Sequence, residues 1–181
     1  MDISLVVNIT AKAWALPILW NLDAGVPGRQ APLLAATGAN RTAFGQSLNH
    51  LIQLGIIERN PGYGHPLRPE FRLTKLGETA ARMASRIRAA TGDEKNRLLR
   101  RAWTVPILSQ LAEPNNFGAF KRQLPMITDR ALSQSLKLLE THDWVVRDVD
   151  VAARPPKPIY YAINEGVLIS QATNYALNTV P

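Results

Sequence analysis

Apolar positions in the second half of the chain recur with the spacing of α-helices. The clearest helix follows Thr128, a residue type that caps helix N-termini well. Its apolar positions are about one turn apart and fall on one face: Leu132, Leu136 and Leu139. The same spacing predicts a helix over 117–124 that ends before Pro125, and the apolar run 102–111 predicts a helix before that one.

A hairpin pattern replaces the helical pattern after these three helices. Residues 144–147 and 159–163 have the composition of paired strands. The loop 154–158 between them contains three prolines, which we expect to lie outside the paired ladder because proline lacks an N–H to donate. Gly166 is predicted to separate the hairpin from an apolar C-terminal helix over about 167–177.

The first half follows the same plan. Its third helix is predicted to begin near Asn40, with the core positions Phe44, Leu48 and Leu51. Strands are predicted over 56–59 and 70–73, on either side of the loop 60–69. Two short helices that lead into a third, closed by a two-stranded hairpin, form a winged helix-turn-helix.

The two halves also share sequence. Residues 12–22 and 101–111 are identical at six of eleven positions. The matches continue at an offset of 88 or 89 residues, and Gly77 and Gly166 are one such pair. A period this long indicates a duplicated domain, because solenoid repeats are only about 20–50 residues long.

These features predict a mainly α chain with small β-hairpins (α+β). We expect two tandem winged helix-turn-helix domains, residues 1–88 and 89–181, that form a pseudo-dimer. Domains of this size are near the lower limit for a stable core, so the halves should support each other. The central segment 79–99 and the terminal helix 167–177 are expected to lie between them.

Composition excludes several classes of protein. The chain has no cysteine, so it has no disulfide, no thiol redox sensor and no cysteine-ligated metal. No apolar stretch reaches the roughly 18 residues of a membrane span, and residues 1–14 are interpreted as structure and not as a signal peptide. A cytoplasmic location without membrane contact is the simplest interpretation.

The charge of the chain points to acidic partners. The formal net charge is +7, and residues 78–101 hold seven cations against three acids. Such an excess favours polyanions such as nucleic acid, because each neutralised phosphate releases condensed counterions. A solvated basic helix face is an equal alternative on charge alone.

Signatures of enzymes are missing. The sequence has no glycine-rich phosphate loop, no nucleophile elbow and no HExxH motif. Its three histidines are scattered without metal-ligand spacing: His50, His65 and His142. We place His50 and His142 on helix flanks, and Trp14 and Trp103 in the core in preference to ligand stacking. No enzyme activity, cofactor or metal is expected.

Several segments match a known family in order and spacing. They are 101–108, 127–140 and 158–161 in the second half and 12–14, 46–48, 54–59 and 71–77 in the first. Together they resemble the HxlR-type transcriptional regulators, relatives of the MarR group. The resemblance implies one winged helix per protomer with dimerisation through terminal helices, so that this chain fuses two protomers.

The chain departs from that family at two places. The cysteine that many members carry near the N-terminus is absent, which rules out thiol sensing. Ser47 and Ser135 stand at a position of the third helix that is often basic in the family.

The third helix of each half carries the candidate DNA-binding residues. An α-helix fits the major groove, where arginine can bond guanine and glutamine or asparagine can bond adenine. The outward positions are Arg130, Ser133, Gln134 and Lys137 in the second half and Arg41, Thr42, Gln46 and Asn49 in the first. Any amphipathic helix shows such residues to water, but a winged-helix framework present twice favours the DNA-binding interpretation.

Loops supply a second set of candidates that could reach phosphates or a minor groove. In or next to the hairpin loops they are His65, Arg68, Arg72, Arg154 and Lys157, and at the end of a second helix they are Lys121 and Arg122. Solvated loop charge is an equal alternative for all of them.

The sequence therefore predicts a regulator of transcription that binds double-stranded DNA specifically, repressor-like, as a single-chain pseudo-dimer. The alternative is a tandem winged-helix scaffold for protein–protein interaction without specific DNA binding. The sequence leaves open a small-molecule effector, the operator, the sign of regulation and further dimerisation.

Overall fold

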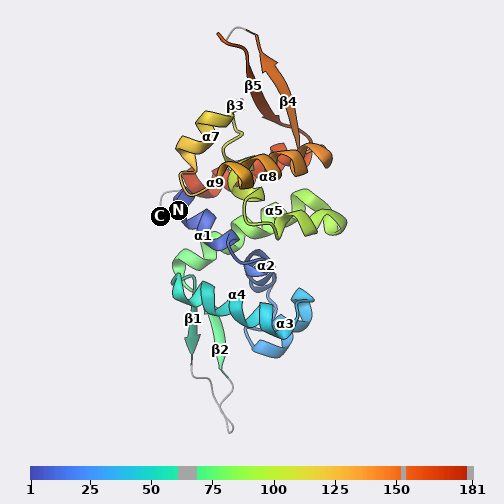
Figure 1. Cartoon of the computed structure of the whole chain (residues 1–181). Helices are drawn as coiled ribbons and strands as arrows, with labels where there is room; N and C mark the ends of the chain where they lie inside the picture. The colour runs from blue at the N-terminus through green and yellow to red at the C-terminus, as the bar shows by residue number, and fades with distance from the viewer. Residues whose placement is uncertain (61–68, 152–153, 179–181) are drawn as a thin grey trace.

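The computed structural model describes residues 1–60, 69–151 and 154–178. Figure 1 shows an elongated molecule with a β-hairpin at each end and helices between them. Within the described residues, the chain combines α-helices with two small antiparallel sheets, which confirms the α+β class.

The first half runs through helices into a hairpin and a long helix. Its elements are α1 Ile3–Thr10, α2 Ala15–Asp23, α3 Gln30–Thr37, α4 Arg41–Gln53, β1 Ile57–Asn60, β2 Glu70–Leu73 and α5 Lys75–Leu99. The Asn40 side chain caps α4 by accepting a hydrogen bond from the Ala43 N–H at 2.8 Å, so the predicted start of this helix is confirmed.

The second half repeats this order from α2 onward, with the short strand β3 added. Its elements are α6 Thr104–Ser109, β3 Asn115–Asn116, α7 Phe117–Gln123, α8 Asp129–Thr141, β4 Val145–Asp150, β5 Lys157–Ala162 and α9 Glu165–Asn178. Thr128 caps α8 by accepting from the Ala131 N–H at 3.2 Å, as the sequence predicted.

The second hairpin differs from the prediction in two respects. The short strand β3 was not predicted, and it pairs with β5 to give the order β3–β5–β4. Pro158 lies inside β5 opposite Val149, so the expectation that the prolines fall outside the ladder was wrong for this residue. β3 pairs only with Ile159 and Tyr160, which leaves that edge of β5 open at Pro158, and an edge position tolerates a residue without an N–H.

Gly166 was predicted to separate the second hairpin from the C-terminal helix. It lies instead inside the helix, buried in the first turn of α9. A Cβ on Gly166 would lie 2.1 Å from the Trp144 carbonyl oxygen, and one on Gly77 in α5 would lie 2.0 Å from the Ile56 carbonyl oxygen. Each helix therefore starts directly on the backbone that enters the hairpin, and only glycine fits at this contact.

Helices from both halves form the middle of the molecule. α5 packs against α2 and α9, and α6 packs against α9 and α1 (Figure 1). The Thr10 hydroxyl at the end of α1 donates to the Ala102 carbonyl at 2.8 Å. The predicted boundary between 88 and 89 falls inside α5, whose helical conformation breaks at Gly92 (φ 65°, ψ 172°).

Two aromatic side chains are less buried than predicted. Trp14 and Trp103 were expected in the core, but they are half-buried residues that directly precede α2 and α6. Trp20, which has no counterpart in the second half, is in the core with 7% of its surface exposed. Tryptophan is so large that a position beside a helix start leaves part of the indole uncovered.

In the described part of the chain, no single helix has the length and hydropathy needed to cross a membrane. α1 and α2 meet that criterion only when they are taken together as a pair bent by 104°.

Candidate nucleic-acid interface

α8 separates its apolar face from its polar face. Leu132, Leu136 and Leu139 are buried in the core of the second half. The four candidates on the opposite face are all exposed: Arg130, Ser133, Gln134 and Lys137. One helix face therefore anchors α8 while the other presents two cations and an amide to solvent, which is the division that a groove-binding helix needs.

α4 is built in the same way. Phe44, Leu48 and Leu51 are buried, with at most 4% of each side chain exposed. The outward residues are again all exposed: Arg41, Thr42, Gln46 and Asn49. This face holds one cation, Arg41, in the first turn of the helix, where α8 has Asp129.

The two serines at the family's often basic position do not face outward equally. Ser47 is only 2% exposed, and its hydroxyl donates to the Ala43 carbonyl at 2.9 Å. Ser135 is half-buried. Ser47 therefore lies on the inner flank of its helix and is not part of the exposed face.

The start of α8 is tied to the helix before it by Lys121. Its ammonium group donates to the Ile127 carbonyl at 2.5 Å and pairs with the Asp129 carboxylate at 2.9 Å. Lys121 was a candidate for phosphate contact, but this geometry gives it a role in holding the turn between α7 and α8. Arg122, the neighbouring candidate, is exposed.

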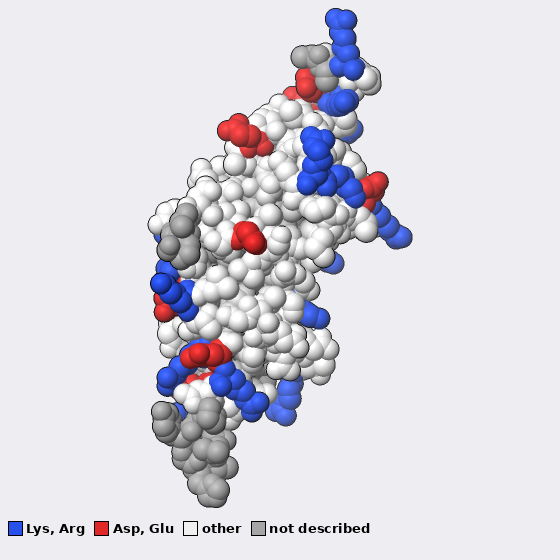
Figure 2. Space-filling model, turned by 90° about the vertical axis from the view of Figure 1, so that its left-hand side faces the viewer, with Lys and Arg blue, Asp and Glu red and all other residues white. Residues whose placement is uncertain are grey.

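The hairpins carry the loop candidates. Arg154 and Lys157 are exposed near the tip of the β4–β5 hairpin. Arg72 on β2 forms an ion pair with Glu70 at 2.6 Å, and the candidates His65 and Arg68 lie outside the described residues. Figure 2 shows that Lys and Arg atoms gather toward the two ends of the molecule and along one edge, while the middle of this flank is largely uncharged.

Two arginines on the hairpins were missed as candidates. Arg59 on β1 and Arg147 on β4 are exposed and occupy equivalent strand positions 88 residues apart. Their recurrence in the repeat was visible in the sequence. Because they stand within strands, only the folded hairpin shows that they face solvent.

The match to a known family falls on the second half of the chain. Residues 98–175 match the HxlR-like helix-turn-helix family. Comparisons with curated proteins and with solved structures gave no match. The HxlR-like segment runs from the end of α5 into α9, so it contains α6 to α8 and both strands of the second hairpin.

The HxlR-like match supports the coarser part of the functional expectation: a helix-turn-helix regulator of transcription that binds DNA. The family consists of regulators and not of enzymes, which agrees with the absence of enzyme motifs from the sequence. Among the described residues, no group of three or more His, Cys, Asp or Glu side chains could hold a metal ion.

Proposed function

We propose that the chain is a specific double-stranded DNA-binding regulator, repressor-like, that acts as a single-chain pseudo-dimer. The observation that carries this proposal is the pair of capped helices, α4 and α8, each with a buried apolar face and a fully exposed polar face. A hairpin lies beyond each helix at the far end of the molecule, in the place of a wing (Figure 1).

The arrangement of the halves supports a pseudo-two-fold. In Figure 1, α7 and the β4–β5 hairpin lie at upper left and upper right, whereas α3 and the β1–β2 hairpin lie at lower right and lower left. α5 and α9 pack together at the centre. A half-turn about the direction of view would therefore exchange α4 with α8 and one wing with the other.

Backbone contacts recur at equivalent residues and support duplication of a whole domain. The Ile56 carbonyl accepts from the Thr74 N–H, and the Trp144 carbonyl accepts from the Ile163 N–H, both at 3.0 Å. The two glycines that open α5 and α9 pack against these same carbonyls. The two halves therefore share the same hydrogen bond and the same glycine contact where each hairpin joins the helices.

Fusion of two reading heads has a consequence for affinity. Once one head is bound, the second is held near its half-site at an effective concentration on the order of millimolar. Two weak contacts then give one strong complex without a dimerisation step. Because the outward faces of α4 and α8 differ, we expect the preferred operator to be an imperfect palindrome.

The proposal is tested by selecting duplexes from a random library and titrating them by fluorescence anisotropy at several salt concentrations. Affinity should fall steeply as salt rises, because each phosphate contact releases counterions. Arg130→Ala and Lys137→Ala should weaken binding by about 1–3 kcal/mol where a bidentate base contact is lost. Thr42→Ala and Asn49→Ala should cost less.

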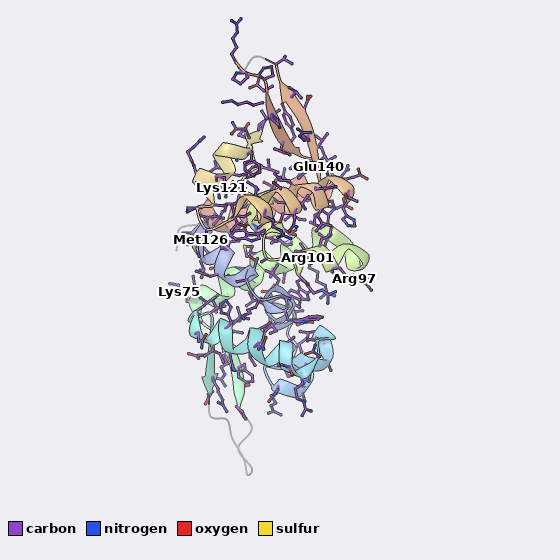
Figure 3. All side chains as sticks on the ribbon, in the orientation of Figure 1. Lys75, Arg97, Arg101, Lys121, Met126 and Glu140 are labelled. Atoms are coloured by element: carbon purple, nitrogen blue, oxygen red, sulfur yellow. The ribbon has the colours of Figure 1, made fainter. Side chains whose placement is uncertain are left out.

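Lys75→Ala is the matched control. Lys75 is an exposed cation at the start of α5 and is not one of the outward residues of α4 or α8, so its removal changes net charge by the same amount (Figure 3). Equal losses from Lys75→Ala and Arg130→Ala would indicate non-specific attraction. If none of the four helix substitutions changes duplex affinity at low salt, a protein-interaction scaffold replaces this proposal.

A further inference from the structure

A pocket of about 260 Å³ lies between α2, the end of α3 and the C-terminal part of α5. We call it the Trp/Arg pocket because its wall contains two tryptophans and three arginines. The polar and aromatic side chains that line it are Trp14, Trp20, Arg88, Arg97, Arg100 and Asn96. The exposed faces of α4 and α8 contribute no residue to it. Its volume is slightly below the range of about 300–1,000 Å³ for small-molecule sites, so a ligand of one or two rings would fill it.

The second half has a smaller cavity at the place that corresponds by the sequence repeat. That cavity, about 70 Å³, is lined by Trp103, Pro125 and Met126 and by the apolar α1 residues Ile3 and Val7. Trp103 is the counterpart of Trp14 at an offset of 89 residues. Figure 3 shows the two sites on opposite flanks, with Met126 at left and Arg97 at right.

The two walls differ in chemistry at equivalent positions. Val7 of the small cavity corresponds to Asn96 of the Trp/Arg pocket, again 89 residues on. Ser109 stands where the Trp/Arg pocket has Trp20. One copy of the site is thus small and mostly apolar, while the other is larger, aromatic and cationic. This comparison rests on the proposed duplication, but the pocket itself does not.

Two of the three arginines in the pocket wall lie over its tryptophans. The Arg100 guanidinium carbon lies 4.6 Å from the centre of the Trp14 ring, and that of Arg88 lies 5.5 Å from the Trp20 ring. A guanidinium that lies over an indole face keeps its N–H groups at the edge, where they can bond a planar anion. Among the side chains that the structure describes, no carboxylate lies within ion-pair distance of Arg97 or Arg100.

We propose that the Trp/Arg pocket binds a small aromatic carboxylate. The carboxylate of the ligand pairs with Arg97 and Arg100, because the planar guanidinium group of arginine matches two carboxylate oxygens. Its ring packs against the indoles, which favour offset or edge-on aromatic contacts. A non-aromatic anion would satisfy the arginines alone, and a neutral aromatic compound would satisfy the tryptophans alone.

The pocket is linked to α4 by a short stretch of chain. Ala36 and Thr37 at the end of α3 line it, and three residues after Thr37 Asn40 caps α4. A ligand that displaces the end of α3 therefore displaces the start of α4. We expect the ligand to change duplex affinity, and this expectation rests on the proposed function.

The test is calorimetric titration of the full chain with benzoate and with indole-3-carboxylate, in the absence of DNA. Both should bind saturably at one site per chain. Inorganic phosphate and benzamide at the same concentrations probe the anion and the ring separately, and each should bind at least roughly 10-fold more weakly, as expected when a charged hydrogen bond or a ring contact is missing. Equal binding of phosphate, two sites per chain, or no saturable heat with either carboxylate would overturn the proposal.

Substitutions locate the site. Arg100→Gln and Arg97→Gln should each weaken carboxylate binding roughly 10- to 100-fold, the loss of a hydrogen bond to a charged group. Arg101→Gln is the matched control, because Arg101 is exposed and does not line the pocket. Arg97 is exposed, so Arg97→Gln decides the matter if Arg100→Gln fails to fold. A loss with Arg101→Gln equal to that with Arg97→Gln would refute the location.

Repeating the duplex titration with saturating benzoate tests the link to DNA. The ligand should shift duplex affinity in the unmodified chain and not in Arg100→Gln. An unchanged affinity would reject the effector role. Because ligand binding is measured without DNA, its failure and the failure of DNA binding are separate results.

Discussion

The glycine at the start of α9 is a position where a single methyl group should be destabilising. The Cβ of Gly166→Ala would lie 2.1 Å from the Trp144 carbonyl oxygen, which is 0.9 Å short of the 3.0 Å that real Cβ contacts reach. The obstacle is backbone and not a flexible side chain. α9 must therefore move away, or the strand entrance must give up the 3.0 Å hydrogen bond from the Ile163 N–H to the same carbonyl.

The cost follows from these two terms. Forced overpacking costs about 1–3 kcal/mol, and a lost backbone hydrogen bond about 0.5–1.5 kcal/mol. Gly166→Ala should therefore lower the free energy of unfolding by about 2–4 kcal/mol, which for a chain of this size lowers Tm by roughly 4–16 °C. Gly77→Ala should behave alike, since its Cβ would lie 2.0 Å from the Ile56 carbonyl oxygen.

Thermal and urea unfolding followed by circular dichroism measure this effect. Gly45→Ala is the control, because Gly45 lies within α4 and a Cβ there meets nothing within 4 Å. It should stabilise the chain by about 0.5–1 kcal/mol, the helix preference of alanine over glycine. A Gly166→Ala variant as stable as the unmodified chain, or one no less stable than Gly45→Ala, would refute the close contact.

Three further outcomes are expected. Asn40→Ala and Thr128→Ala should each cost about 1 kcal/mol in urea unfolding through loss of a helix cap, and a neutral result at either would contradict the cap geometry. Lys121→Met should lower stability while changing duplex affinity less than Arg122→Ala does, because Lys121 is bound within the protein; the reverse order would restore Lys121 as a DNA contact. Asp143→Gly should raise Tm, since Asp143 has a φ of 56° that glycine adopts at lower cost, and a fall in Tm would show that its side chain stabilises the turn.

Features set by neighbouring residues could be predicted from the sequence. Asn40 and Thr128 cap their helices through hydrogen bonds to the N–H three residues later, and the leucine spacing of α8 places one face in the core. The turn after α4 and α8 is local too, because Gly55 and Asp143 both adopt positive φ, at 68° and 56°. Such features depend on residues a few positions apart, and the sequence pattern records them directly.

Features set by distant residues could not be predicted. β3 exists because Asn115 and Asn116 lie beside β5, more than 40 positions later, and their composition does not favour a strand. The position of Pro158 within β5 follows from where that pairing stops. The role of Gly166 depends on its contact with the Trp144 carbonyl. The sequence shows only a glycine after a strand and does not reveal this contact.

The Trp/Arg pocket shows the same limit at the level of function. Its tryptophans come from α2 and the residue before it, and its arginines come from α5 and the residue after it. The sequence showed an excess of arginine and the missing counterpart of Trp20, but these were two unrelated observations until the fold placed them in one wall.

The proposed duplication within one chain would explain how such a site arises. In a dimer of identical chains every substitution appears twice, so a change that closes one pocket closes both. Between the two halves of this chain, packing positions such as Gly77 and Gly166 are identical. Several residues that face solvent or line the two pockets differ between the halves, among them Arg41 and Asp129, and Asn96 and Val7. Under the proposed duplication, the same freedom that gives α4 and α8 different outward faces lets one half hold a larger, cationic pocket, while apolar α1 residues narrow its equivalent in the other.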